Sequence, residues 1–306
     1  MSTVISTTTS FGKDCRDLID TIADRGLDLV QNPWKRKITE EELISFLEEN
    51  RPVGILAGTE PITRSAMEKS RGFLRVISRV GVGLDNVDRK AAEELRIQVY
   101  RTEGVLNQAV AELTLGLTLS ALRAIHPHDR QIRDGVWQKS MGSLLQGKVV
   151  GVVGFGGIGQ RVGELVKAFG ANILFYDPVP KKIDWAKSVN LEKLFSESDI
   201  VTIHASSSEQ ILGKNELNSL CKPGVIIVNM ARGGLVDEDA LCKALASGRV
   251  ACACLDVFEK EPYSGPLTKF ENVILTPHIG SYAIEARIRM EEMAVENLLK
   301  GLGFRG

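Results

Sequence analysis

The sequence predicts an α/β protein with two domains, each built on a parallel β-sheet. Short runs rich in Val and Ile alternate with amphipathic stretches along nearly all of the 306 residues, a pattern typical of strands joined by crossover helices. The length suits two domains better than one small domain. A glycine-rich turn between a predicted strand and a predicted helix begins only at Gly154, so the residues before it must form an α/β domain of their own.

The first hundred residues carry the pattern of one parallel α/β unit. Thr39, Thr63 and Asp88 stand where helix N-caps are favoured, and three glutamates follow Thr39. We expect strands at residues 4–6, 27–31, 53–56, 74–78 and 97–100, with helices near 13–25, 39–49, 63–70 and 88–95.

A long helical pattern follows, from residue 107 to about residue 134. Its apolar residues cover more than one face, which predicts a helix buried nearly all round, and Pro127 should bend or end it. Such a helix either links two domains or lies in a subunit interface, and the pattern leaves both open. We expect it to support a homodimer.

A second alternation of strands and helices begins at Lys148. We expect strands at residues 149–153, 173–176, 200–204, 225–229, 251–255 and 273–275, with helices near 157–169, 191–195, 214–220 and 238–246. A last helix at 281–300 is too short to be a domain. We therefore expect a discontinuous first domain, residues 1–101 and 281–306, into which a second domain, residues 102–280, is inserted.

The composition excludes several classes of protein. Hydrophobic residues make up 43% and charged residues 25% of the chain, and the formal net charge is -1, so neither disorder nor a general attraction to nucleic acid is expected. Five cysteines are too few for a disulfide framework, and Cys252 and Cys254 are expected to be small buried side chains rather than metal ligands. We expect no metal site, no membrane span and no secretion signal, and hence a cytoplasmic protein.

The turn at residues 149–159 fits the pattern G-x-G-x-x-G of dinucleotide sites. Gly154 permits a tight turn, Gly156 lets the backbone approach a pyrophosphate, and Gly159 lets the new helix pack against the strand. The helix N-terminus offers N–H groups to the phosphates. Glycines in such a turn also occur for packing reasons alone. The residues predicted to contact the dinucleotide here are Gly154, Phe155, Gly156, Gly157, Ile158 and Gly159.

An acidic residue ends the next predicted strand. Asp177 lies 18 residues after Gly159, where a carboxylate receives the hydroxyls of the adenosine ribose. A negative charge there repels the additional phosphate of NADP, and no Arg follows directly. We therefore predict NAD as the cofactor, with a plain surface cap as the alternative interpretation of Asp177.

Three later segments each place a chargeable residue after a predicted strand, namely Arg232, Glu261 and His278. Ligand crevices form at the carboxyl ends of strands in open parallel sheets. Taken singly, each residue has a structural explanation: Arg232 pairs with Asp237, Glu261 is a solvated loop charge, and His278 is a hydrogen-bonded loop histidine.

Together with the dinucleotide pattern, these segments resemble the D-isomer-specific 2-hydroxyacid dehydrogenases. The resemblance extends over nearly the whole chain and includes residues 81–88 and 107–112; residues 79–86 look closest to the phosphoglycerate dehydrogenase branch. It implies a catalytic Arg, Glu and His at Arg232, Glu261 and His278. The further cofactor contacts that the resemblance implies are His204, Ala205, Met230, Ala231, Asp256 and Gly280, although Ser206 replaces the usual Pro of the His204 loop.

The chemistry agrees with these roles. Arg232 can bind the carboxylate of a 2-oxo acid through two hydrogen bonds. Protonated His278 can donate a proton to the oxygen at C2 during reduction, and neutral His278 can take it back during oxidation. Glu261 behind the imidazole fixes its tautomer and favours its charged form.

The resemblance also implies a substrate site that draws on the first domain. The implied substrate-binding residues are Gly58, Arg79, Val80, Gly81, Val82, Asn107, Arg232 and His278. Phosphoglycerate dehydrogenases commonly carry an Arg in the loop that corresponds to residues 57–59 to bind the phosphate, and this chain has Ala57 there. Arg79 and Arg101 are the candidates to compensate for its loss.

We therefore predict an oxidoreductase that transfers a hydride between NAD(H) and a small D-2-hydroxy acid/2-oxo acid pair, with 3-phosphoglycerate among the candidate acids. The alternative is an NAD(H)-sensing binding module that resembles the transcriptional corepressors related to this family. Turnover of a panel of acids separates the two hypotheses.

Overall fold

The computed structural model describes residues 2–207 and 209–304, and the chain divides into two compact units. Unit 1 comprises Met1–Leu106 and Ala283–Gly306, and unit 2 comprises Asn107–Tyr282. The predicted boundaries differ slightly, because residues 102–106 belong to unit 1 and residues 281–282 to unit 2. Each unit is described by itself below.

Unit 1 contains a five-stranded sheet in which every pair of neighbouring strands is parallel. The strand order is β2-β1-β3-β4-β5. Its strands are β1 (Ser2–Ser6), β2 (Leu27–Gln31), β3 (Gly54–Ala57), β4 (Val76–Arg79) and β5 (Gln98–Arg101), and its helices are α1 (Asp17–Ala23), α2 (Glu40–Asn50), α3 (Arg64–Lys69), α4 (Arg89–Glu94) and α10 (Ile284–Leu302).

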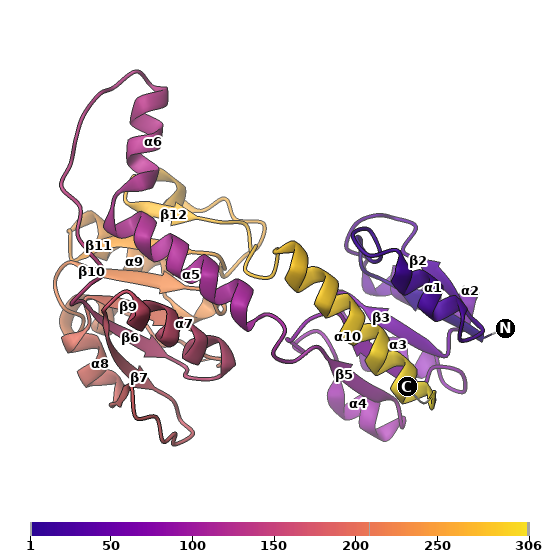
Figure 1. Cartoon of the computed structure of the whole chain (residues 1–306). Helices are drawn as coiled ribbons and strands as arrows, with labels where there is room; N and C mark the ends of the chain where they lie inside the picture. The colour runs from indigo at the N-terminus through magenta and orange to yellow at the C-terminus, as the bar shows by residue number, and fades with distance from the viewer. Residues whose placement is uncertain (1, 208, 305–306) are drawn as a thin grey trace. The chain divides into compact units, whose positions relative to one another are not determined.

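Helices cover both faces of this sheet (Figure 1). The side chains of α2, α3 and α4 pack with Ile5, Ile55 and Ile77 in one hydrophobic cluster. The side chains of α1 and α10 pack with Val4 and Leu56 in the other. Consecutive residues of the three central strands β1, β3 and β4 face opposite clusters, so these strands are apolar at successive positions, as buried parallel strands must be. The last helix of the chain thus completes the core of the first unit.

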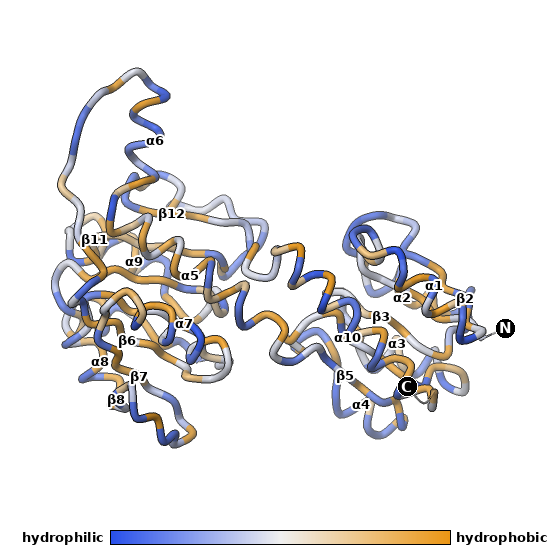
Figure 2. Tube along the Cα trace, in the orientation of Figure 1, coloured by the Kyte–Doolittle hydropathy of each residue, from blue (hydrophilic) through white to orange (hydrophobic). Residues whose placement is uncertain are grey.

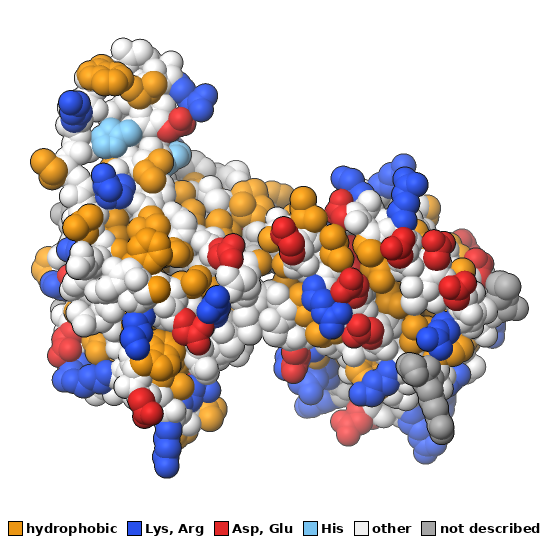
Figure 3. Space-filling model, in the orientation of Figure 1, with side chains coloured by type: hydrophobic (Ala, Val, Ile, Leu, Met, Phe, Trp, Pro, Cys, Tyr) orange, Lys and Arg blue, Asp and Glu red, His pale blue; other side chains and the backbone are white. Residues whose placement is uncertain are grey.

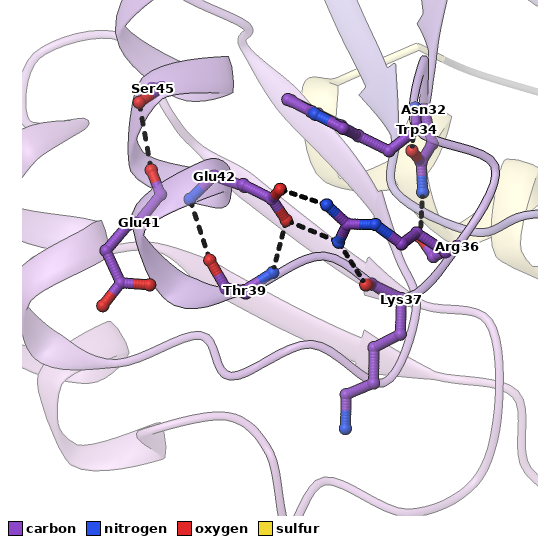
Figure 4. Close-up of polar contacts among 8 residues, drawn as sticks. All are labelled: Asn32, Trp34, Arg36, Lys37, Thr39, Glu41, Glu42 and Ser45. Carbon is purple, nitrogen blue, oxygen red and sulfur yellow. Dashed lines mark hydrogen bonds and ion pairs between the residues drawn. The ribbon is translucent and has the colours of Figure 1, made fainter.

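The start of α2 follows directly from its sequence. Thr39 Oγ1 accepts a hydrogen bond from Glu42 N–H at 3.3 Å, and Glu42 Oε2 accepts one from Thr39 N–H at 2.9 Å. This reciprocal capping box satisfies two otherwise unpaired donors. Figure 4 shows that Arg36 also binds the Glu42 carboxylate. The N-caps predicted at Thr63 and Asp88 are confirmed in the same way, by bonds to Ala66 N–H and Ala91 N–H respectively.

The predicted helix at 13–25 is shorter in the structure. It begins at Asp17 because the residues before it form a turn and not a helix. In this turn Gly12 adopts a left-handed conformation, and its N–H donates to the Glu291 carboxylate at 2.9 Å. This long-range bond between the first loop and α10 is invisible to a local pattern.

Unit 2 contains a seven-stranded sheet, also parallel throughout. The strand order is β12-β11-β10-β9-β6-β7-β8. Its strands are β6 (Val149–Val153), β7 (Asn172–Tyr176), β8 (Lys187–Ser188), β9 (Ile200–Ile203), β10 (Val225–Asn229), β11 (Val250–Leu255) and β12 (Val273–Leu275). Its α-helices are α5 (Asn107–Leu122), α6 (Ile125–Arg133), α7 (Gly157–Ala168), α8 (Leu191–Glu197) and α9 (Glu238–Ala246).

Apolar residues are concentrated along the central strands of this sheet (Figure 2). Helices α8 and α9 and a π-helix at Glu216–Leu220 contribute to the large cluster on one face. Helices α5 and α7 pack against each other and against strands of the sheet. The predicted α/β fold, with one parallel-sheet domain inserted into another, is confirmed.

The long helix predicted from 107 to 134 is two helices. Ala124 adopts a left-handed conformation that separates α5 from α6. The break comes three residues before Pro127 because the proline ring would clash with the carbonyl four residues earlier, whereas a proline is tolerated in the first turn of a new helix. The expected burial all round is also wrong, since Leu113, Leu115 and Leu119 of α5 remain partly exposed.

Helix α6 and the segment after it project from the rest of unit 2 (Figure 1). We call residues 125–144 the arm. Apolar side chains lie at its surface (Figure 3), and the most exposed are Trp137 at 82% and Met141 at 99%. Ile125, Ile132 and Leu144 are also more than half exposed. Exposed large apolar side chains gathered in one segment are typical of interaction surfaces.

Among residues 2–207 and 209–304, no helix is both long enough and apolar enough to cross a membrane. Within the same residues, no cluster of three or more His, Cys, Asp and Glu side chains is arranged to hold a metal ion. Cys254 is buried, as expected, with its thiol directed at the Leu117 carbonyl, whereas Cys252 is only partly buried.

Candidate active site

The glycine-rich turn lies at the point of unit 2 where the strand order reverses, between β6 and β9. Gly154 follows β6 with a φ of +86°, and a Cβ there would lie 2.6 Å from the Ala205 nitrogen. A Cβ on Gly159 would collide with the Gly154 carbonyl. Only glycine fits at these two positions, and α7 therefore begins close to the strand edge with its N–H groups directed at the crevice.

Asp177 follows β7 and stands beside this turn. Its two carboxylate oxygens accept backbone N–H bonds from Phe155 at 2.8 Å and Val179 at 2.9 Å, and Lys181 lies 3.8 Å away. The carboxylate thus links the first strand-to-helix turn to the end of the second strand. This is the position from which an acidic side chain receives ribose hydroxyls, so the residues present fit a dinucleotide.

His204 follows β9 on the other side of the same point. Its Nε2 lies 2.8 Å from the Thr202 hydroxyl, and its Nδ1 is buried without a hydrogen-bond partner among the described residues. Burial lowers the pKa of His204 from its ordinary value of 6.5 to about 3. The imidazole is therefore neutral at physiological pH.

Arg232, Glu261 and His278 meet at one pocket of roughly 240 Å³ in unit 2. They follow β10, β11 and β12, which are neighbours in the sheet. The carboxyl-terminal ends of these three parallel strands lie at the same edge, which brings the three residues together. The other residues that line the pocket are Gly233, Val257, Phe258 and Glu259.

The loop that carries Arg232 is held by the last residue of β10. The Asn229 side chain accepts a bond from Ala231 N–H at 3.1 Å and donates one to the Arg232 carbonyl at 2.8 Å. The next residue must be glycine, because a Cβ on Gly233 would overlap the Phe258 backbone. This close approach of the β10 and β11 loops places Arg232 beside the Glu261 segment.

His278 and Glu261 form a hydrogen-bonded pair. The Nδ1 atom of His278 lies 2.9 Å from Glu261 Oε2, and the other Glu261 oxygen accepts Phe258 N–H at 3.1 Å. The His278 side chain is 51% exposed, so its ring is open to a ligand. The carboxylate holds one ring nitrogen and leaves Nε2 for chemistry.

Asp256 fixes the conformation of the His278 loop. It is 1% exposed and accepts bonds from the Thr276 hydroxyl at 2.6 Å, Ile279 N–H at 2.8 Å and Gly280 N–H at 2.8 Å. Held between these residues, His278 adopts a φ of +55°, which is uncommon for a residue with a side chain. Such strain is typical of functional positions.

The other predicted site residues fall into two groups. In unit 2, Met230 and Ala231 are buried in the β10 loop, and the Asn107 side chain packs closely against Gly157 at the start of α7. In unit 1, Gly58 follows β3, and Arg79 to Val82 end β4 and begin the next loop.

Several supporting residues were missed by sequence reasoning. Asn229 and Thr276 hold the Arg232 and His278 loops, and both stand at strand ends beside residues that had been singled out. A polar residue that ends an apolar strand is the signal that would have found them. Thr7 and Glu60 of unit 1, which form a buried pair, had no such signal.

The fold and the site together define a dinucleotide-dependent dehydrogenase with two α/β units. Comparison with known proteins agrees. A profile of the D-isomer specific 2-hydroxyacid dehydrogenase NAD binding domain matches residues 115–280. The chain is 36% identical over 299 residues to a hydroxypyruvate reductase of Thermotoga maritima, covering 93% of this chain and 97% of that protein.

Two further similarities extend the comparison. A D-3-phosphoglycerate dehydrogenase of Methanocaldococcus jannaschii is 40% identical over 276 residues, which are 87% of this chain, but the chain spans only 52% of that relative's length. The crystal structure of the TT0316 protein from Thermus thermophilus superposes with a TM-score of 0.90 at 36% identity, covering 98% of this chain and 96% of that one. The chain belongs to the D-isomer-specific 2-hydroxyacid dehydrogenases, and its cofactor is NAD.

Proposed function

We propose that this protein interconverts a small D-2-hydroxy acid and its 2-oxo acid, with Arg232, Glu261 and His278 as its catalytic residues. The observation that carries the proposal is the His278–Glu261 pair, 2.9 Å apart, in the same pocket as the Arg232 guanidinium. Bound NAD(H) supplies the hydride donor or acceptor; binding, orientation and proton transfer are left to the protein.

Arg232 is proposed to bind the substrate carboxylate. Its backbone is fixed by Asn229, and one guanidinium nitrogen donates to the Ala231 carbonyl at 2.7 Å. A guanidinium held in this way presents parallel N–H donors that match the two oxygens of a carboxylate. The substrate is thereby oriented with its C2 oxygen toward the remaining residues of the pocket.

His278 is proposed to move the proton. With Nδ1 directed at Glu261, Nε2 of the protonated ring donates to the C2 oxygen during reduction and accepts from the hydroxyl during oxidation. Glu261 keeps the ring oriented and stabilises its positive charge, as a carboxylate behind a catalytic histidine does. Asp256 acts indirectly, because its hydrogen bonds to Ile279 N–H and Gly280 N–H hold the loop that carries His278.

The cofactor contacts are proposed at the edge where β6 and β9 end. The glycines of the 154–159 turn and the N-terminus of α7 receive the phosphates, and Asp177 receives the ribose hydroxyls. His204, Ala205, Met230, Ala231, Asp256 and Gly280 complete the predicted set.

Three acids are supported by named relatives. Glyoxylate is the substrate named for a relative from Aeropyrum pernix. Hydroxypyruvate is the substrate named for the Thermotoga maritima relative, and 3-phosphoglycerate for the Methanocaldococcus jannaschii relative. The further substrate contacts that we propose are Gly58, Arg79, Val80, Gly81, Val82 and Asn107. Identity alone does not choose between an acid with a phosphate and one without it.

We also propose that the protein is a cytoplasmic homodimer whose copies meet through the arm. The exposed Trp137, Met141 and Ile132 side chains favour a second copy as the partner. Light scattering should give twice the chain mass for the wild type, and Trp137→Ser together with Ile132→Glu should shift the protein toward the monomer. Wild-type protein of monomer mass would contradict this part of the proposal.

The experiment that tests the function is a panel of initial rates. Purified protein with NADH is offered pyruvate, glyoxylate, hydroxypyruvate, oxaloacetate, 2-oxoglutarate and 3-phosphohydroxypyruvate, and the loss of NADH absorbance is followed. We expect turnover of at least one of them to a D-2-hydroxy acid. Tight NADH binding without turnover of any acid would instead favour the NAD(H)-sensing module.

A further inference from the structure

The sheet of unit 1 has its own point of strand-order reversal, between β1 and β3. In the order β2-β1-β3-β4-β5, the connections leave these two strands in opposite directions, and open α/β sheets bind ligands at the carboxyl ends of such a pair. Thr7 directly follows β1, and Glu60 lies three residues beyond the end of β3. The hydrogen bonds and charge of these two side chains therefore influence which ligands this edge of the sheet can bind.

Thr7 and Glu60 form a buried hydrogen-bonded pair at this point. The Thr7 hydroxyl donates to Glu60 Oε1 at 2.5 Å, and Gly58 N–H lies within hydrogen-bond distance of both, 2.8 Å from the hydroxyl and 3.2 Å from the carboxylate. Glu60 is 1% exposed. The loop after β3 thus folds around a carboxylate, and its Gly58 N–H is directed at that carboxylate.

The arginine nearest to this pair is also directed inward. Arg79 is 9% exposed and donates to the Val80 and Ala57 carbonyls. Burial raises the pKa of Glu60, and the positive charge of Arg79 opposes that shift. A Cβ on Gly81 would lie 2.7 Å from an Arg79 terminal nitrogen, so the guanidinium lies directly under the loop after β4. Arg101, the second candidate cation, pairs with Glu103. Both arginines considered as phosphate ligands are therefore engaged with other groups.

From this arrangement we infer that Glu60 is a specificity-determining residue, which makes the protein select 2-oxo acids with an uncharged tail over acids whose tail ends in a phosphate. The inference rests on the proposed function and deepens it. A phosphate at this edge would be repelled by the negative charge of the buried Glu60 carboxylate, while the positive charge of Arg79 is already shared with that carboxylate. Specificity obtained by repelling the wrong ligand is as effective as attraction of the right one.

The test compares kcat/KM for hydroxypyruvate with kcat/KM for 3-phosphohydroxypyruvate. The wild type should prefer hydroxypyruvate. Glu60→Gln keeps the shape of the side chain and removes its charge, and we expect it to raise the relative kcat/KM for the phosphorylated acid about tenfold. Glu60→Asp keeps the charge and should leave the preference for hydroxypyruvate in place. If Glu60→Gln does not fold, Glu60→Met supplies a neutral side chain of similar volume.

Glu291→Gln is the matched control. Glu291 is another buried carboxyl group of unit 1, 4% exposed, which accepts Gly12 N–H and pairs with Arg287. Its neutralisation tests whether loss of any buried carboxylate in this unit changes the substrate ratio. We expect the ratio of the control to equal that of the wild type.

A binding measurement separates this inference from the proposed function. With NAD present, D-glycerate and 3-phosphoglycerate are added and the melting temperature is followed. We expect 3-phosphoglycerate to stabilise Glu60→Gln more than the wild type, whether or not turnover is seen. A wild type that prefers the phosphorylated acid, or equal responses of the wild type and Glu60→Gln in both experiments, would overturn the inference.

Discussion

The two sheets reverse their strand order by the same rule, but they place opposite chemistry at the point of reversal. In unit 2 this point is bordered by Gly154, whose lack of a side chain lets backbone approach backbone, and by a helix N-terminus. In unit 1 it is occupied by the buried Thr7–Glu60 pair. The first arrangement offers N–H donors to phosphates, and the second offers a carboxylate.

By the general rule for open α/β sheets, topology fixes where a ligand binds, and the residues just after the strands decide which ligand it is. The glycine turn suits a dinucleotide with two phosphates. A buried carboxylate suits a ligand without one. The Glu60 variants test the unit 1 side of this contrast. The four predictions below test the unit 2 side, and they begin with the largest expected effect.

Replacement of His278, the proposed proton donor, should have the largest effect on the unit 2 edge. We expect His278→Ala to lower kcat for reduction of hydroxypyruvate by about 10³-fold, because general acid catalysis is lost. NADH binding, followed by fluorescence, should stay near the wild-type value. A mutant with nearly full kcat would remove His278 from the catalytic set.

Replacement of Arg232, which we propose binds the substrate carboxylate, should have a smaller effect. Arg232→Lys keeps the charge but loses the two parallel donors, so we expect kcat/KM to fall about 10- to 100-fold. Initial rates over a range of hydroxypyruvate concentrations measure this loss. Unchanged kcat/KM would show that the carboxylate binds elsewhere.

A side chain at the glycine turn should weaken the cofactor site. We expect Gly154→Ala to raise the Kd of NADH about tenfold. Residue 154 has a left-handed backbone conformation, and a Cβ on it would collide with the Ala205 backbone. Gly248→Ala is the matched control, since Gly248 has a φ of +74° but open space around its Cβ position. It should cost about 1 kcal/mol of stability and leave the Kd unchanged. Equal Kd changes in the two variants would contradict the assignment of the turn.

The smallest effect concerns the pH dependence of stability. His204 has a folded pKa of about 3 against an ordinary 6.5, so the unfolded chain binds a proton between these values that the folded chain does not. The free energy of unfolding should therefore fall by about 1.4 kcal/mol per pH unit as pH decreases below 6.5. In His204→Gln this contribution should be absent. Urea denaturation at several pH values from 7 to 5 measures the free energy of unfolding of both proteins. The same fall with pH in the wild type and in His204→Gln would contradict the prediction.

Much of the architecture was predictable because its causes are local. Apolar strand runs, the Thr39 cap and the glycine turn each depend on neighbours in sequence. The break between α5 and α6 was misplaced because Pro127 acts on the turn before it. The early start predicted for α1 was wrong because the contact between Gly12 and Glu291 joins residues far apart in the chain.

The same distinction applies to the sites. Arg232, Glu261 and His278 could be found because each follows a recognisable strand. Glu60 was not predicted because its role depends on its hydrogen bond with Thr7. Thr7 follows a different strand and becomes the partner of Glu60 only when the sheet forms. Sequence patterns identify strand ends, but not which strand ends become neighbours.

The most direct test of the catalytic assignment is a double-mutant cycle on His278 and Glu261. Rates of hydroxypyruvate reduction are measured for the wild type, His278→Ala, Glu261→Gln and the double mutant. If the carboxylate acts through the imidazole, Glu261→Gln should lower kcat about 10²-fold in the wild type and have almost no further effect once His278 is alanine. Independent, multiplicative losses would contradict the paired role that the 2.9 Å contact assigns to them.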